Sequence, residues 1–95
     1  MEKVAELKSK VDKLVSEIAY TMKTIQSLDK RIHEEENPES SYTLTDALLQ
    51  EGRLFDEMTL ELEIVLADYI NTLEKDKRPV PISYYKLQKK IKARG

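Results

Sequence analysis

The only histidine of the chain, His33, is followed directly by three glutamates at residues 34–36. Imidazole nitrogens and carboxylate oxygens are both common ligands of divalent metal ions. A protein metal site needs several such ligands that converge from separate parts of the fold, whereas this group is one short run with a single histidine. We therefore expect neither a metal site nor a metal cofactor here.

Carboxylates also recur in a pattern that some enzymes use. Residues 35–39 read Glu-Glu-Asn-Pro-Glu, and the second half of the chain is rich in glutamate and aspartate. This combination resembles the all-α nucleoside triphosphate pyrophosphatases, in which such clusters on helices hold magnesium ions. The chain departs from that pattern because Pro38 interrupts the helix that would align the carboxylates, and because Glu63 and Asp68 do not follow the family spacing E-x-x-D. Since a glycine-rich phosphate loop and a nucleophile elbow are also missing from the sequence, we expect a protein that is not an enzyme.

Basic residues surround two adjacent tyrosines near the end of the sequence. The members of this basic tail are Arg78, Tyr84, Tyr85, Lys86, Lys89, Lys90, Lys92 and Arg94. Lysine and arginine neutralise phosphate charge and aromatic rings stack on bases, so residues 77–95 suit contact with a nucleic acid. The same chemistry suits an acidic protein groove, an anionic membrane surface or the acidic remainder of this chain. We expect a protein partner, with a nucleic acid as the alternative.

The two parts of the chain differ in charge. Residues 1–74 carry 8 basic and 17 acidic side chains, while residues 75–95 carry 8 basic and 1 acidic side chain. The chain has no cysteine, which excludes disulfides and thiolate metal sites. No apolar run is long enough for a transmembrane segment, and charged residues stand where a secretory signal has its apolar core. We expect an intracellular, cytoplasmic protein, or a nuclear one in a eukaryote.

A heptad stripe in the first third of the chain predicts the element that organises the fold. Apolar residues recur at alternating steps of three and four, interrupted only at Thr21. They are Val4, Leu7, Val11, Leu14, Ile18, Ile25, Leu28 and Ile32. A helix with such a stripe must pack along another helix to bury it.

Breakers and caps divide the chain into three predicted helices. The first runs from about residue 2 to 35 and ends before Pro38, and Thr43 is the expected N-cap of the second, over about residues 43–75. The short connection makes the two helices antiparallel neighbours. Residues 78–81 read Arg-Pro-Val-Pro and predict an extended linker, after which Ser83 caps a short helix from Tyr84 to about Ala93.

The second helix has apolar residues on two sides. One stripe matches that of the first helix and forms the seam between them: Leu48, Phe55, Met58, Leu62, Val65, Leu66, Tyr69 and Leu73. On the opposite side lie Leu49, Leu60, Ile64 and Ala67. One helix cannot cover both sides, so this second face needs the C-terminal segment, a second copy of the chain, or another protein. We favour a second copy, because association is how short helical chains commonly complete a core.

The predicted class is therefore all-α. Residues 1–76 form an antiparallel, coiled-coil-like helical hairpin, residues 77–95 form the proline-containing linker and a short basic amphipathic helix, and a homo-oligomer, preferentially a dimer, completes the bundle. A parallel two-stranded coiled coil is the competing topology, because β-branched residues and leucine alternate in the first stripe. The expected function is that of an adaptor that self-associates and engages a partner through its basic tail.

Overall fold

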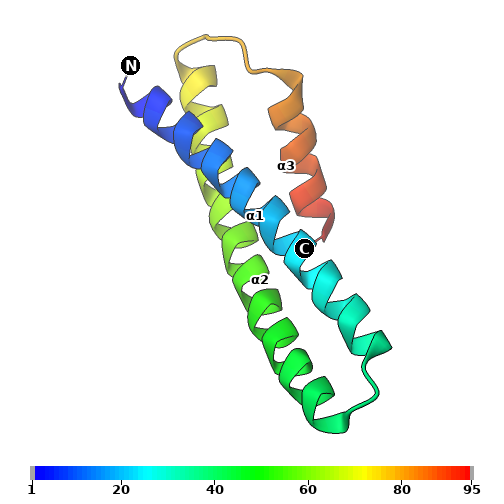
Figure 1. The fold of residues 1–95 in the computed structure, drawn as a ribbon. Helices are drawn as coiled ribbons and strands as arrows, with labels where there is room; N and C mark the ends of the chain where they lie inside the picture. Colours follow the sequence, from blue (N-terminus) through cyan, green and yellow to red (C-terminus); the bar gives the residue numbers. More distant parts are fainter. Residues whose placement is uncertain (1, 95) are drawn as a thin grey trace.

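The computed structural model describes residues 2–94, which form three helices and no strand. The helices are α1 (Glu2–Glu34), α2 (Pro38–Lys75) and α3 (Ile82–Arg94). Helices α1 and α2 lie antiparallel and pack along each other, and α3 lies beside one half of this hairpin (Figure 1). The result is a rod of 58 × 24 × 16 Å. The predicted all-α hairpin with a short C-terminal helix is confirmed. In this structure the stripe of α1 packs on α2 of the same chain, and not on a second α1 as in a parallel coiled coil.

The seam between α1 and α2 is built mainly from the two predicted stripes, and the buried Ile70 joins it although it was in neither stripe. Its buried side chains are Val4, Leu7, Val11 and Leu14 of α1, and Met58, Leu62, Leu66, Tyr69, Ile70 and Leu73 of α2, joined by Ile91 of α3. Thr21, which interrupts the stripe in the sequence, still occupies a seam position and is buried. The helical spacing of the apolar residues thus decides which side of each helix enters the core.

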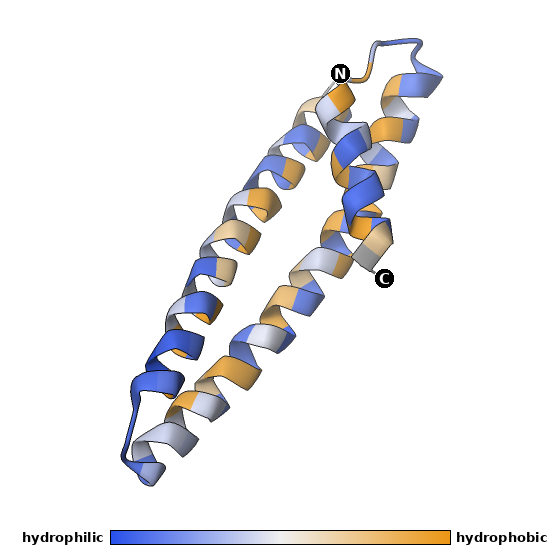
Figure 2. Ribbon diagram, turned by 90° about the vertical axis from the view of Figure 1, so that its right-hand side faces the viewer, coloured by the Kyte–Doolittle hydropathy of each residue, from blue (hydrophilic) through white to orange (hydrophobic). Residues whose placement is uncertain are grey.

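Burial is uneven along the hairpin. The α1 seam residues from Val4 to Leu14 are buried, whereas Ile25, Leu28 and Ile32 farther along the same stripe are only half-buried. Figure 1 shows the reason, because α3 accompanies the half of the hairpin that contains the first turns of α1, and the other half has only two helices. Hydrophobic residues follow the facing sides of the helices in Figure 2. The fold is thus a three-helix bundle at one end and a two-helix hairpin at the other.

Helix α2 begins five residues before the position predicted from Thr43. The side-chain Oδ1 of Asn37 accepts a 3.0 Å hydrogen bond from the backbone N–H of Glu39, and Pro38 occupies the first turn. Proline is well tolerated there because its missing N–H has no helical partner in any case. The hydroxyl of Thr43 instead donates to the carbonyl of Glu39 at 3.1 Å, within the helix. The prediction was wrong because Pro38 was interpreted only as a helix breaker.

A left-handed residue ends α2 and turns the chain toward α3. Lys77 has φ 56°, and the backbone N–H of Arg78 donates to the carbonyl of Leu73 at 2.9 Å, which is a Schellman-type helix end. Helix α3 then begins at Ile82, earlier than the predicted start at Tyr84, and Ser83 lies within its first turn rather than at a cap. The backbone N–H of Tyr84 donates to the carbonyl of Pro81 at 3.0 Å. None of the described helices combines the length and the apolar character needed to cross a lipid bilayer.

Candidate functional site

The side of α2 that points away from α1 carries apolar side chains that no other described residue covers. Leu49, Leu60 and Ile64 are 59%, 60% and 65% exposed, and Ala67 beside them is half-buried. At 3.6 residues per turn these four residues project from the side opposite the buried Met58. We call them the outer stripe, and the structure places them on one face as the sequence predicted.

The C-terminal segment does not cover the outer stripe. Helix α3 packs instead on the side of α2 that carries Tyr69, and its Ile91 and Leu87 join the same apolar cluster as Leu66. Of the three candidates for covering the outer stripe, folding back of residues 82–94 is therefore excluded. A second copy of the chain or a different protein remains.

One aromatic residue extends the outer stripe and was missed from the sequence. Tyr42 is 73% exposed and lies seven residues, or about two turns, before Leu49 on the same side of α2. The predicted helix start at Thr43 placed Tyr42 in a loop, so Tyr42 was not assigned to any side of the helix. The heptad step to Leu49 was the signal that would have found it.

Carboxylates line both edges of the outer stripe. The helical phase puts Glu57, Glu61 and Asp68 along one edge and Asp56, Glu63 and Glu74 along the other. Helix α2 as a whole carries nine acidic and two basic side chains. The part of the outer stripe formed by Leu60, Ile64 and Ala67 is thus apolar with negative edges, and the exposed Arg53 lies on the same side of α2 between Leu49 and Leu60.

Tyr84 holds α3 against the hairpin. Its ring meets that of Tyr69 edge to face, with ring centroids 5.2 Å apart and an interplanar angle of 76°. Burial raises the pKa of the Tyr84 hydroxyl, and the nearby Asp12 carboxylate of α1 adds to the effect. The sequence predicts that Tyr84 belongs to the basic tail and could stack on a base. In the structure it is half-buried and its ring packs on Tyr69.

Tyr85 forms a second anchor at the start of α3. Its hydroxyl donates a 2.9 Å hydrogen bond to Oε2 of Glu74, near the end of α2. That hydrogen bond is the main reason that the pKa of Tyr85 is raised. Tyr85 is 40% exposed, so part of the residue remains open to solvent.

The basic side chains of the tail point into solvent. Arg78, Lys86, Lys89, Lys90 and Lys92 are all exposed, and the side chain of Arg94 lies outside the described part of the chain. Ion pairs among the described residues join Lys8 to Asp12, Lys13 to Glu17 and His33 to Asp29, so none of them uses a lysine of α3. Helix α3 carries no acidic residue. Its positive charge is therefore available to an external group.

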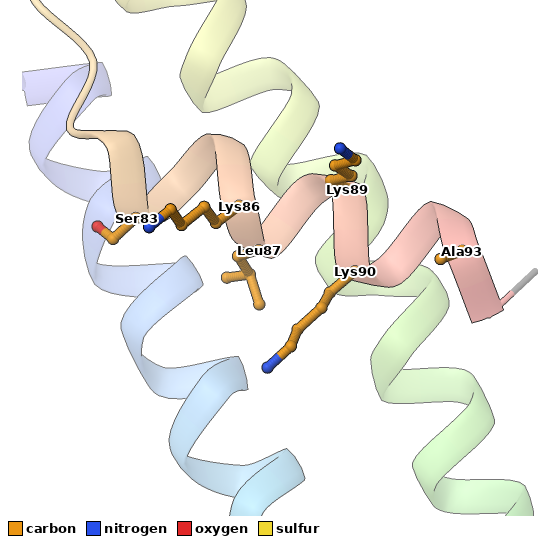
Figure 3. Close-up of a pocket in the computed structure, with 6 residues that line it drawn as sticks. All are labelled: Ser83, Lys86, Leu87, Lys89, Lys90 and Ala93. Atoms are coloured by element: carbon orange, nitrogen blue, oxygen red, sulfur yellow. The ribbon is translucent and has the colours of Figure 1, made fainter.

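An open apolar groove runs between α1 and α3, with α2 beneath it. Its volume is about 510 Å3, and its lining residues are Ile18, Met22, Thr59, Leu62, Leu87, Lys90, Ile91 and Ala93. It continues along α3 into a second depression that adds Ser83, Lys86 and Lys89. Figure 3 shows Leu87 between Lys86 and Lys90 on this side of α3. The groove thus has an apolar floor and lysines on the rim that α3 supplies.

The residues that the sequence singled out for metal chemistry lie at the connection between α1 and α2. Nδ1 of His33 is 2.8 Å from the carbonyl oxygen of Asp29, and Oε1 of Glu35 accepts a 3.0 Å hydrogen bond from the backbone N–H of Asn37. Nowhere in residues 2–94 do three or more histidine, aspartate or glutamate side chains come together as a metal site would require. The outer stripe and the lysine-rimmed groove are therefore the two candidate functional surfaces.

Comparisons of this chain with models of protein families, with curated proteins and with solved structures each found no match.

Proposed function

We propose that this protein is a non-enzymatic adaptor of the cytoplasm, which holds partners together by packing helices. In this proposal the outer stripe of α2 mediates self-association, preferentially as a dimer, and the basic tail engages a further partner. The observation that supports it most strongly is the exposure of Leu49, Leu60 and Ile64 on the side of α2 that the other described residues leave open.

The exposed stripe is large enough to matter for a chain of this size. Each leucine or isoleucine side chain left in water forgoes about 1.5 to 3 kcal/mol relative to burial. A small domain has a total stability of only about 5 to 10 kcal/mol. Covering three such residues with a second copy would therefore make a substantial contribution to the folded state.

The basic tail supports the second part of the proposal. The lysines of α3 are exposed and unpaired among the described residues, so an acidic partner could approach them without breaking an existing ion pair. A nucleic acid is the alternative partner. It is less favoured because the Tyr84 ring packs on Tyr69 and is not free to stack on a base.

Solution mass measured by light scattering tests the self-association. We expect the wild-type chain at tens of micromolar to exceed the 11.1 kDa of one copy. The variant Ile64→Asp should fall to the mass of a monomer while keeping its helical circular dichroism. The matched control is Tyr20→Asp, because Tyr20 is 75% exposed on α1 and lies outside both candidate surfaces. A wild-type monomer, or equal masses for both variants, would contradict the proposed dimerisation.

Charge neutralisation tests the tail better than deletion does. Removing residues 79–95 would uncover core residues such as Leu66 and Tyr69, so lost binding would have two explanations. The double variant Lys89→Gln/Lys92→Gln keeps the docked face of α3 and removes two external charges. We expect it to capture less of any acidic partner in a pull-down than the control Lys10→Gln/Lys13→Gln. Salt-sensitive binding of DNA or RNA that the tail variant loses would favour the nucleic-acid alternative instead.

A further inference from the structure

The two candidate surfaces are opposite in charge and similar in their apolar content. The outer stripe presents Leu60 and Ile64 between rows of carboxylates. The groove between α1 and α3 presents Met22 and Leu87 beside exposed lysines. An apolar strip with negative edges therefore complements an apolar groove with a positive rim.

The two surfaces of one chain cannot meet each other. The outer stripe lies on the side of α2 opposite its seam with α1, because Leu49 and Met58 differ by about half a turn in helical phase. The groove has α2 as its floor, through Thr59 and Leu62, and so opens away from that helix. Because the outer stripe and the groove face in opposite directions on one chain, the outer stripe can enter only the groove of another copy.

Symmetric pairing of two outer stripes is disfavoured by charge. Such a contact would set one α2 helix, with nine acidic and two basic side chains, directly against another. Like charges placed opposite each other across an interface oppose association. Placing the same α2 face on α3, which has several lysines and no acidic residue, would instead bring opposite charges together.

We infer that the outer stripe of one copy docks into the lysine-rimmed groove between α1 and α3 of a second copy. This inference rests on the proposed self-association and names the surface that receives the stripe. Leu60 and Ile64, one turn apart, would cover the apolar floor near Met22 and Leu87. The carboxylates of Glu57 and Glu61 would then lie toward Lys86 and Lys90.

A contact between two different surfaces has a consequence for assembly. Each copy that donates its outer stripe still has its own groove open, so a further copy can add in the same way. Such heterologous contacts close into a ring or continue as an open chain, whereas a contact of one surface with itself stops at a dimer. The inferred contact therefore extends the proposed dimer to larger assemblies as concentration rises.

Reciprocal charge reversal tests the inference. The groove variant is Lys86→Glu/Lys90→Glu, and the stripe variant is Glu57→Lys/Glu61→Lys; all four residues are exposed, so both variants should remain folded. We expect each variant alone to self-associate at least about tenfold more weakly than the wild type, and an equimolar mixture to associate again. Lys10→Glu/Lys13→Glu on α1 makes the same change of charge outside both surfaces and should behave like the wild type.

The outcomes separate this inference from the function on which it rests. If the groove variant self-associates like the wild type while Ile64→Asp is monomeric, the outer stripe does mediate association but does not enter the groove, and the inference is overturned. If the wild type is itself monomeric, the proposed self-association and the inference both fail. Weak association of each variant alone, restored in the mixture, supports the heterologous contact, because two symmetric stripes would not respond to a change in α3.

Discussion

The ring of Tyr84 on α3 meets the ring of Tyr69 on α2 edge to face, with 5.2 Å between their centroids. Tyr69 is itself buried in the seam of the hairpin. This contact makes the basic C-terminal helix a part of the core, so its apolar side is fixed on the hairpin and its lysines are fixed outward. The arrangement gives the chain a positive surface with a defined position.

Removal of the Tyr84 ring should release α3. We expect Tyr84→Ala to cost roughly 2 to 3 kcal/mol in the free energy of unfolding, since it loses aromatic burial and the pairing with Tyr69. A free helix of 13 residues is marginal in water, so circular dichroism should lose helical signal equal to α3. Tyr84→Phe keeps the ring and is the control. Full helicity and unchanged stability in Tyr84→Ala would show that α3 does not depend on this contact.

Alkaline pH should loosen the same helix. The pKa values of Tyr84 and Tyr85 are both raised above the ordinary 10.0, by burial with Asp12 nearby for Tyr84 and by the hydrogen bond to Glu74 for Tyr85. A group whose pKa is higher in the folded state stabilises that state fully below its unfolded pKa, and this contribution is lost as pH rises through the folded pKa. Docking of α3 should therefore weaken only above about pH 10.

Titration of tyrosinate absorbance measures this effect. In the wild type, Tyr84 and Tyr85 should ionise above the ordinary tyrosine pKa of 10.0, and helicity should fall over the same pH range. Tyr85→Phe should leave one late-ionising tyrosine fewer and slightly weaken docking at neutral pH. Ionisation of Tyr84 and Tyr85 near that ordinary value would count against the anchoring role given to them.

Two substitutions to aspartate distinguish the two sides of α2. Leu62 is only 2% exposed, so Leu62→Asp buries a carboxylate in the seam and should cost about 5 kcal/mol or more, which is comparable to the whole stability of a small domain and should unfold the chain. Ile64 lies two residues away and is 65% exposed, so Ile64→Asp should keep its helical circular dichroism and change only the assembly. If the two variants gave the same spectra, the separation of seam and outer stripe would be wrong.

Gly52 offers a stabilising substitution. It lies inside α2, and a Cβ atom placed on it would have no neighbour within 4 Å, so no close approach within the described chain requires glycine there. Alanine is better than glycine in a helix interior by about 1 kcal/mol. Gly52→Ala should therefore raise the midpoint of thermal unfolding. An unchanged or lower midpoint would contradict this prediction, and would mean that a contact between copies of the chain requires glycine at position 52.

The hairpin could be predicted because its signal is local. Val4, Leu7 and Val11 repeat at heptad steps, and such a repeat fixes which side of a helix is buried before any partner is known. The start of α2 could not be placed in the same way, since Pro38 suits both a chain break and the first turn of a helix. Only the hydrogen bond from Glu39 to Asn37 decides between them.

The candidate surfaces were only partly predictable. The exposure of Leu60 and Ile64 follows from helical phase, because one neighbour cannot cover two sides of α2. The groove does not follow from any local pattern, since it needs Met22 of α1 and Leu87 of α3 to lie on either side of α2. The packing of the Tyr84 ring could not be predicted for the same reason, because its ring partner Tyr69 is fifteen residues earlier in the chain.

Labelling of a single thiol tests most directly whether a second copy covers the outer stripe. The chain has no cysteine, so Ile64→Cys and Tyr20→Cys each create one reactive site. We expect a maleimide to react with position 64 more slowly in concentrated protein than in dilute protein, while position 20 reacts at the same rate in both. Equal rates at position 64 under both conditions would mean that the stripe stays in solvent, and the proposed self-association would be wrong.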